Sequence, residues 1–318
     1  MEIDNYNKIL QGDVIERLKD IEDNTIQCVV TSPPYWGLRD YGEDDQLGLE
    51  ETPEEYVENM VNVFREVKRV LKDDGTLWLN IGDSYARTPN SQVSQKGLCA
   101  TKNDHKKYEY SHKKDYGDTI KPKDLVGIPW RLALALQADG WYLRQDIIWH
   151  KPNPMPESVT DRCTKAHEYI FLLSKSAKYY YDADAIREPS LEYGKDKRSD
   201  MGNIRYEGKR TIDKTGANGQ QGFCTITEKR NKRSVWKINT KPYKDAHFAV
   251  FPEELPTLCI KAGSKEGDVV LDPFFGSGTT GWVAQRLYRK WMGIELNPEY
   301  IKIANKRFVQ QELFSELV

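Results

Sequence analysis

The last third of the chain contains a strand–glycine turn–helix–strand unit that restricts the fold more than any other stretch. Residues 268–272 (DVVLD) form the pattern of a buried strand, 273–278 (PFFGSG) a turn, 279–289 a helix and 291–296 (WMGIEL) a second strand. Parallel strands need a crossover of this kind, and such units build sheets that helices cover on both faces. We therefore predict an α/β fold.

The same alternation of helix and strand continues through most of the chain. Apolar side chains recur at helical spacing after Pro53, and TLWLNIG follows them as a buried strand. Periodicity predicts helices over 53–71, 128–138, 252–262 and 298–312, and strands over 76–82, 142–150 and 167–175. With 318 residues, the chain is long enough for one large α/β domain with a small appendage.

Two stretches interrupt this alternation. Residues 84–124 are rich in Ser, Lys, Asn, Gln, Asp and Tyr and poor in apolar side chains, which indicates a long flexible loop. Residues 188–237 mix Gly, Asn and Thr with clustered lysines and arginines, which indicates an inserted region.

Composition excludes several classes of protein. The formal net charge is −2, so a nucleic-acid partner would need a local basic surface rather than a basic protein. No apolar run approaches the roughly 18 residues that span a bilayer, and the first residues do not resemble a signal peptide. The five cysteines are scattered, which argues against a disulfide framework and a zinc site. We expect a cytoplasmic protein with no metal and no membrane partner.

The glycine turn near the C-terminus indicates a cofactor. Gly276, Gly278 and Gly281 satisfy the spacing G-x-G-x-x-G, and the next strand places Glu295 where it can bind ribose hydroxyls. The unit therefore predicts a cofactor that contains adenosine. Asp272 puts a negative charge where the phosphates of a dinucleotide would lie, whereas S-adenosylmethionine has no phosphate and carries an ammonium and a sulfonium. The charge favours S-adenosylmethionine; a dehydrogenase that uses NAD is the alternative.

Near the N-terminus, a strand-like run over 28–30 stops at the sequence Ser32-Pro33-Pro34-Tyr35. Neither proline can donate a hydrogen bond to a sheet, and each restricts the residue before it. A simple turn could use Gly or Asn. This proline elbow leaves carbonyl groups unpaired and displays aromatic rings, which suits a flat ligand.

The pair of motifs TSPPY and DPFFGSGTT resembles the DNA amino-methyltransferases, in the permuted β group where the catalytic motif precedes the cofactor motif. The segments IIWHKPNPMPES, HEYIFLLSK and HFAVFPEEL add to a resemblance that covers most of the chain. It implies a Rossmann-like S-adenosylmethionine-dependent methyltransferase fold with a mixed seven-stranded sheet that contains one antiparallel strand. Residues 1–187 would be the catalytic half of this domain, 188–237 a target-recognition insertion and 238–318 the cofactor-binding half.

The resemblance also implies roles for residues at matching positions. Ser32, Pro33, Pro34 and Tyr35 would form the catalytic motif. The residues implied at the cofactor are Asp272, Phe274, Gly276, Gly278 and Thr279 around the glycine turn, Glu295 on the ribose, Asp13 near the adenine, and Phe248 and Pro252 near the methionine end. Asn153 would face the target base, with a turn-forming role as the alternative.

The chemistry of the elbow suits an exocyclic amine of a nucleobase, whose lone pair is delocalised into the ring. The side-chain oxygen of Ser32 and the carbonyl of Pro33 can accept the amine protons and free that lone pair, while Tyr35 can stack on the base. The base must first leave the duplex. Methyl transfer would then be a direct displacement at the sulfonium. No Pro-Cys dipeptide occurs, so the nucleophile of cytosine carbon-5 methylation is missing.

The target base and the partners follow from the same resemblance. Relatives with Ser at the first elbow position commonly act on cytosine N4 and those with Asp on adenine N6, so we expect cytosine N4, with adenine N6 as the alternative. An RNA or protein-glutamine substrate and a non-catalytic DNA-binding module also stay open. Expected partners are double-stranded DNA, a cognate restriction endonuclease and a second copy in a homodimer. Within the insertion, the predicted DNA contacts are Lys229, Arg230, Lys232 and Arg233. The alternative is a charged surface that only faces water.

Overall fold

The computed structural model describes residues 6–37, 46–86, 115–117, 119–190, 228–240 and 251–315, with side chains up to 308 in the last range. The chain divides into two compact units, Met1–Asp182 with Ser234–Val318 and Ala183–Arg233. The predicted division of the methyltransferase domain into halves stays a prediction. Phe248, most of 84–124 and the central part of the predicted insertion lie outside the described residues.

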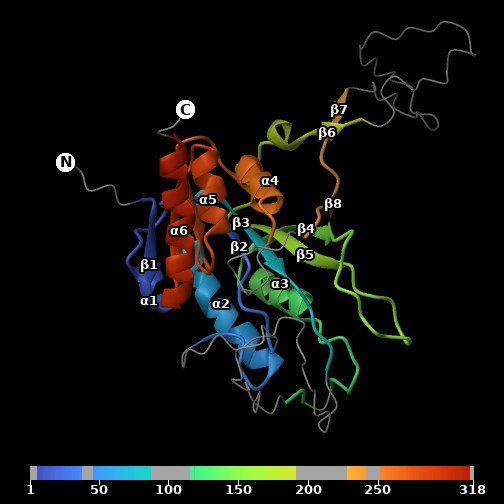
Figure 1. The fold of residues 1–318 in the computed structure, drawn as a ribbon. Helices are drawn as coiled ribbons and strands as arrows, with labels where there is room; N and C mark the ends of the chain where they lie inside the picture. Colours follow the sequence, from blue (N-terminus) through green and yellow to red (C-terminus); the bar gives the residue numbers. More distant parts are fainter. Residues whose placement is uncertain are drawn as a thin grey trace, which may run out of the picture. The chain divides into compact units, whose positions relative to one another are not determined.

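The larger unit is built on an eight-stranded sheet with the strand order β1-β10-β9-β2-β3-β5-β4-β8. Helices flank this sheet (Figure 1). The strands are β1 (Lys8–Gln11), β2 (Ile26–Thr31), β3 (Leu71–Ile81), β4 (Tyr142–His150), β5 (His167–Ser174), β8 (Val235–Lys237), β9 (Val269–Asp272) and β10 (Lys290–Glu295). Strand β5 runs antiparallel to both of its neighbours, and all other pairs are parallel.

The predicted mixed sheet with one antiparallel strand is confirmed, but the strand count of seven was one too low. The additional strand is β8, which comes from the end of the predicted insertion. It pairs with β4 at the sheet edge, with Val235 opposite Ile148 and Trp236 opposite Trp149. Trp236 is 3% exposed in this position, so burial of its ring stabilises the added strand.

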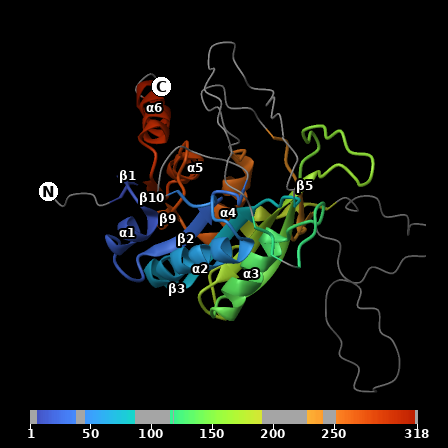
Figure 2. The same cartoon turned by 90° about the horizontal axis from the view of Figure 1, so that it is seen from below.

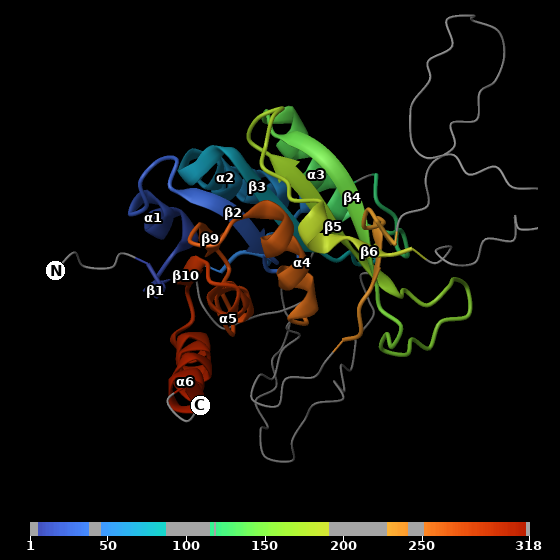
Figure 3. The same cartoon turned by 90° about the horizontal axis from the view of Figure 1, so that it is seen from above.

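Among the described residues, six α-helices cover the sheet. Their bounds are α1 (Val14–Lys19), α2 (Pro53–Val70), α3 (Ile128–Ala138), α4 (Glu254–Gly263), α5 (Thr279–Arg286) and α6 (Pro298–Ser315). Helices α1, α2 and α3 lie on one face, where α2 and α3 run side by side (Figure 2), and α4, α5 and α6 lie on the other (Figure 3). The result is a three-layer α/β/α arrangement.

Local sequence explains the longest helix and the central strand. The hydroxyl of Thr52 caps α2 by accepting a hydrogen bond from the amide of Glu55 at 3.1 Å, and Pro53 occupies the first turn. The helix buries one apolar face, including Tyr56 and Phe64, against the sheet. All six residues of β2 are buried, because helices cover both of its faces and strands flank it on both sides.

Some boundaries differ from the predicted ones. Helix α5 ends at Arg286 rather than at 289, because the chain turns at Tyr288, whose φ of 59° is left-handed. In the smaller unit, a 3₁₀ turn (Asp184–Ile186) precedes β6 (Glu188–Pro189), which pairs antiparallel with β7 (Lys229–Arg230). Within the described ranges, no helix has the length and apolarity needed to cross a membrane, and no cluster of acidic, His and Cys side chains is arranged to hold a metal.

Candidate active site

The two predicted motifs leave the sheet at the same edge. Strands β2 and β9 are parallel neighbours, with Cys28 opposite Val270, so their carboxyl ends lie together. The hydroxyl of Thr31, the last residue of β2, donates to Oδ1 of Asp272, the last residue of β9, at 2.7 Å. The proline elbow begins at Ser32 and the glycine turn follows Asp272 directly. The elbow and the turn therefore share one site.

The carboxylate of Asp272 is buried and accepts hydrogen bonds on both oxygens. The backbone amide of Phe274 joins Thr31 on Oδ1 at 3.1 Å, and the hydroxyl of Thr280 donates to Oδ2 at 2.7 Å. Burial raises the pKa of Asp272 to about 7, against the lowering effect of these three hydrogen bonds. Contact with the cationic end of the cofactor stays a prediction; the carboxylate itself joins the glycine turn to β2.

Packing of Phe275 dictates the shape of the glycine turn. Its ring stacks on Trp291 with 5.2 Å between centroids, and a Cβ at Gly281 or Gly293 would come within 2.7 or 2.3 Å of that ring. Gly276 is different: its φ is 53°, and within the described residues no atom lies within 4 Å of a Cβ placed there. The turn therefore presents bare backbone to open space, which allows a ligand to approach closely.

The acidic end of β10 lies beside this bare backbone. Oε2 of Glu295 accepts the amide of Gly276 at 2.7 Å, and the amide of Gly12 donates to the Glu295 carbonyl at 3.0 Å. Asp13 follows at once and caps α1 through its carboxylate, which accepts two helix amides at 2.9 and 3.0 Å. Three residues predicted at the cofactor are thus brought together: Gly276 of the glycine turn, Glu295 at the ribose and Asp13 near the adenine.

Helix α5 begins immediately behind the turn. Gly278 is its N-cap with a φ of 79°, and Thr279 is its first residue. The buried hydroxyl of Thr279 accepts from Arg307 of α6 at 3.0 Å, and Arg307 also donates to Glu253 at 2.7 Å. The side chain of Thr279 therefore holds helices together, and its cofactor contact stays a prediction.

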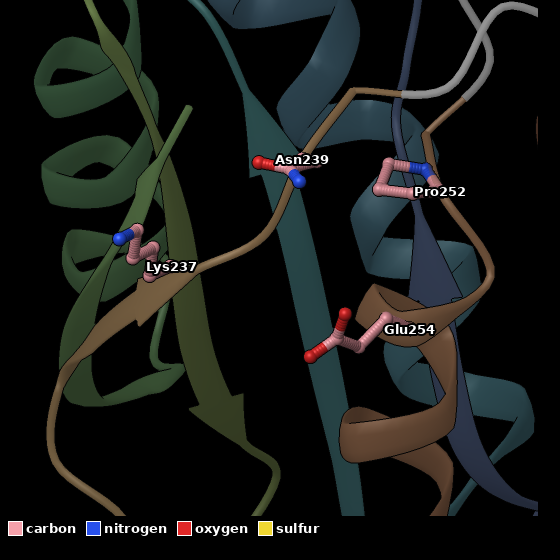
Figure 4. A pocket seen from close by; sticks show the side chains of 4 residues that line it. All are labelled: Lys237, Asn239, Pro252 and Glu254. Atoms are coloured by element: carbon pink, nitrogen blue, oxygen red, sulfur yellow. The ribbon is translucent and has the colours of Figure 1, made fainter. Parts of the chain in front are cut away.

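A cavity of about 200 Å³ is lined by Lys237, Asn239, Pro252 and Glu254 (Figure 4). The carboxylate of Glu254 points from the start of α4 into the space beside the segment that carries Asn239. Pro252, predicted near the methionine end of the cofactor, is buried at this cavity.

The proline elbow is held by its neighbours on α2 and in the following loop. Pro33 is buried, and the carbonyl of Pro34 accepts the hydroxyl of Tyr56 at 2.9 Å. Trp36 is 2% exposed and donates from Nε1 to the carbonyl of Glu50 at 2.9 Å. In the described part of the chain, no donor is hydrogen-bonded to the Pro33 carbonyl, which is the backbone acceptor that the sequence predicts.

Tyr35 connects the elbow to polar groups of the sheet. Its hydroxyl donates to Oε2 of Glu168 at 2.8 Å and receives the hydroxyl of Ser32 at 3.3 Å. Nδ2 of Asn80 donates to the same carboxylate oxygen at 3.2 Å, and the ammonium of Lys151 pairs with the other oxygen. Burial raises the pKa of Tyr35 well above its ordinary value, and the charge of Glu168 raises it further, so the phenol stays protonated.

The ring of Tyr35 has room in this position only because residue 82 is glycine. A Cβ at Gly82, directly after β3, would come within 2.7 Å of the ring atom Cε2. The glycine therefore sets how closely the ring packs on the sheet edge.

The predicted DNA contacts of the smaller unit surround one carboxylate. Arg230 contacts Glu188 at 2.9 Å, while Lys232 and Arg233 approach it at 3.9 and 3.8 Å. Lys229 lies beside Arg230 in β7. One carboxylate cannot neutralise three cations, and the side chain of Arg233 is 63% exposed, so positive charge remains at this surface.

Asn153, predicted to face the target base, is occupied by backbone contacts in the larger unit. Its Oδ1 accepts the amide of Thr240 at 3.0 Å and its Nδ2 donates to the carbonyl of Thr240 at 3.1 Å. This reciprocal pair secures the chain that follows β8. Both the contact with the base and the turn-forming alternative stay predictions.

Four polar residues of the site were not predicted as site residues from the sequence: Thr31, Asn80, Lys151 and Glu168. Glu168 and Lys151 lie within the segments that carry the family resemblance, and Thr31 directly precedes the elbow. The available signal for Glu168 and Lys151 was a charged residue next to the apolar part of a strand. Such a charge needs partners when it is buried, which indicates a polar site.

The site combines three features: an open glycine turn, a strand that ends in Glu295, and a proline elbow with hydrogen-bond acceptors. Together they form the arrangement of a methyltransferase that uses S-adenosylmethionine. The open space at Gly276 and the carboxylate of Glu295 fit an adenosine cofactor without phosphates. A family model described as DNA methylase, of the N6 and N4 type, matches residues 26–306. The chain belongs to this DNA methylase family.

Individual relatives agree with this assignment. The chain is 49% identical over 305 residues to the Type II methyltransferase M.SmaI of Serratia marcescens, covering 96% of this chain and 91% of that protein. It is 48% identical over 299 residues to the Type II methyltransferase M.Cfr9I of Citrobacter freundii, covering 94% and 86%. These relatives place the chain among enzymes of DNA methylation and restriction-modification.

Solved structures share the fold. The PvuII DNA methyltransferase (cytosine-N4-specific) aligns with a TM-score of 0.62 at 20% identity, covering 96% of this chain and 90% of that one. A protein from Thermus thermophilus assigned as a DNA modification methylase, in complex with S-adenosyl-L-methionine, aligns with a TM-score of 0.55 at 23% identity, covering 95% and 94%. The methyl donor follows from the family rather than from these structures: the DNA methylase family to which the chain belongs uses S-adenosylmethionine.

Proposed function

We propose that this chain methylates the exocyclic N4 amine of a flipped cytosine in double-stranded DNA. The observation that carries the proposal is the hydroxyl of Ser32, which donates its proton to Tyr35 and so keeps its lone pairs for accepting. Together with the carbonyl of Pro33, it offers two neutral acceptors for the two protons of an amine. Hydrogen bonds from these protons favour a pyramidal nitrogen, whose lone pair can attack the methyl group. The nitrogen then loses one proton to water, and the sulfur leaves as a neutral thioether.

Residues around the glycine turn would hold the cofactor. S-Adenosylmethionine supplies an electrophilic methyl group on a positively charged sulfur. The backbone at Gly276 would allow close approach, and Glu295 and Asp13 would bind the adenosine part at the ends of β10 and β1. Pro252 and Phe248 would lie at the methionine end. The hydrogen bond between Thr31 and Asp272 then keeps this cofactor loop in register with the elbow.

Two arguments favour cytosine over adenine. The resemblance associates Ser at the first elbow position with cytosine N4, and Asp with adenine N6. The second support is that the nearby carboxylate of Glu168 is engaged by Tyr35, Asn80 and Lys151, which would leave Ser32 to act as a neutral acceptor. Adenine N6 is the second candidate, because it too offers an amine beside a ring nitrogen.

Mass spectrometry of nucleosides tests the target base. DNA is isolated from a host without DNA methylation of its own that expresses the protein, and digested to nucleosides. We expect N4-methylcytosine, absent when Ser32→Ala is expressed in its place. Appearance of N6-methyladenine instead would refute the choice of base, and absence of both from a folded, cofactor-binding protein would refute DNA methylation at this elbow.

The remaining partners are also proposals. Lys229, Arg230, Lys232 and Arg233 would contact DNA phosphates, which predicts binding that weakens as salt rises. A cognate restriction endonuclease would cleave the sequence that this enzyme protects, as the relatives named Type II methyltransferases suggest. Light scattering of the purified protein tests the proposed homodimer, and a mass of one chain at all concentrations contradicts it.

A further inference from the structure

Four polar side chains form a row from the proline elbow into the sheet: Ser32, Tyr35, Glu168 and Lys151. Ser32 donates to Tyr35 at 3.3 Å, Tyr35 donates to Glu168 at 2.8 Å, and Lys151 donates to the far oxygen of Glu168. The side chains of Glu168 and Lys151 are only 16% and 18% exposed. We infer that Glu168 is a positioning residue for methyl transfer, which fixes the hydrogen-bond direction of this row so that Ser32 can only accept from the target amine.

The direction of the row follows from the chemistry of its two ends. A lysine ammonium can only donate and an ionised carboxylate can only accept. Tyr35 has a single O–H, and the oxygen of Glu168 at 2.8 Å is both closer and more negative than Oδ1 of Asn80 at 3.4 Å. The Tyr35 proton therefore goes to Glu168, and the Tyr35 oxygen becomes the acceptor for Ser32.

This direction decides what Ser32 presents to a base. Its only proton is committed to Tyr35, so its exposed side consists of lone pairs. A serine hydroxyl without this restraint rotates, and part of the time it would present its hydrogen to the amine. Hydrogen bonds in a row of one direction also polarise one another, so each strengthens the next. The inference rests on the proposed role of the elbow but not on which base it methylates.

Asn80 secures the carboxylate from a second side. Its Nδ2 donates to Oε2 of Glu168 at 3.2 Å and to the carbonyl of Tyr169 at 3.1 Å. With Tyr35 and Lys151, Glu168 therefore accepts from three side chains that come from three parts of the sheet edge. Such a fully partnered carboxylate holds a defined orientation, as a positioning residue must.

The test compares the isosteric change Glu168→Gln with Tyr35→Phe and with the double variant. The readout is the single-turnover rate of methyl transfer to unmethylated genomic DNA, with cofactor affinity from calorimetry and DNA affinity from fluorescence anisotropy measured alongside. We expect each single variant to lower the rate about 10- to 100-fold, because each removes the hydrogen bond from Tyr35 to the charged carboxylate of Glu168. The affinities for cofactor and for DNA should stay unchanged. The double variant should lose no more than either single variant, because both act through one row.

Two further variants serve as controls. Glu168→Asp keeps the charge and should recover part of the rate lost in Glu168→Gln. Asp139→Asn removes a carboxylate that is 17% exposed and paired with Arg65 at 2.6 Å, at the end of α3, and should keep the wild-type rate. Its carboxylate is about as buried as that of Glu168, although its partner Arg65 is 58% exposed, so the variant measures the effect of losing a half-buried ion pair away from the elbow.

Several outcomes would overturn the inference. A wild-type rate in Glu168→Gln or Tyr35→Phe would do so, as would losses that multiply in the double variant, or a cofactor affinity that falls in step with the rate. If Glu168→Gln does not fold, Tyr35→Phe decides, because it breaks the same row and keeps the ring. Nucleoside analysis of the wild type separates this result from failure of the proposed function, because it reports the methylated base independently of any variant.

Discussion

Replacing Asp272 by Asn tests the link between elbow and glycine turn. Asn has the same shape, and its Oδ1 can still accept the Thr31 hydroxyl and the amide of Phe274. Thr280 can accept from the new amide and direct its own proton to the carbonyl of Val30, 3.2 Å away. The hydrogen-bond pattern is therefore retained, and the main change is removal of a buried ionisable group.

The magnitude follows from the pKa of Asp272, which burial raises from 3.8 to about 7 in the folded protein. Between these values the folded state holds a proton that the unfolded state has lost, so wild-type stability falls as pH rises. From about pH 5 to about pH 8 this group removes about 2.5 kcal/mol from the free energy of unfolding. Asn does not titrate, so its stability relative to wild type should rise by about that amount over the same range.

Urea denaturation at a series of pH values measures this difference, followed by the fluorescence of the eight tryptophans and by circular dichroism. All other titrating groups are common to both proteins and cancel. Curves of stability against pH that run parallel for the two proteins would show that Asp272 titrates normally. The argument for a buried charge at this link would then fail.

Three further substitutions address other parts of the site. Gly82→Ala places a methyl group 2.7 Å from the elbow tyrosine, so we expect roughly 10-fold slower methyl transfer in single-turnover assays and a loss of about 1–3 kcal/mol in urea denaturation. Gly276→Ala should weaken cofactor binding in calorimetry. Gly267→Ala should not, although this glycine also has a positive φ, of 83° against 53°, and equally open surroundings. Equal affinities in both variants would contradict a ligand at the turn. Changing Lys232 and Arg233 together to Glu should weaken DNA binding about 10-fold at low salt and leave cofactor affinity intact, and equal loss of both affinities would refute that separation.

Most of the fold could be predicted because its elements carry strong local patterns. Helix α3 has the predicted bounds, since a glycine precedes it and Pro129 lies in its first turn. Strand β8 could not be predicted, because the three residues Val235–Lys237 are too short for a periodic pattern and lie in a polar region. Only pairing with β4 makes them a strand. Non-local pairing of this kind leaves no trace in a short window of sequence.

The two motifs of the site were predictable as motifs, but the side chains that connect them were not. Thr31 meets Asp272 across 241 positions, and Tyr35 meets Glu168 across 133. Such contacts depend on which strands become neighbours and in what register, and no single stretch of sequence contains that information. Asn153 shows the converse, because a position chosen from its motif turned out to have both ends of its amide engaged by Thr240.

The separation between Thr31 and Asp272 has a consequence for biosynthesis. Ribosomes add about 5–20 residues per second, so roughly 10–50 s pass between synthesis of the two residues. Strand β1 stays unpaired for longer still, because its partner β10 is made after β9. A nascent chain therefore carries the elbow long before the glycine turn can join it. A fragment that ends before Asp272 lacks the partner of Thr31, so the elbow and the glycine turn come together only after residue 272 has been made.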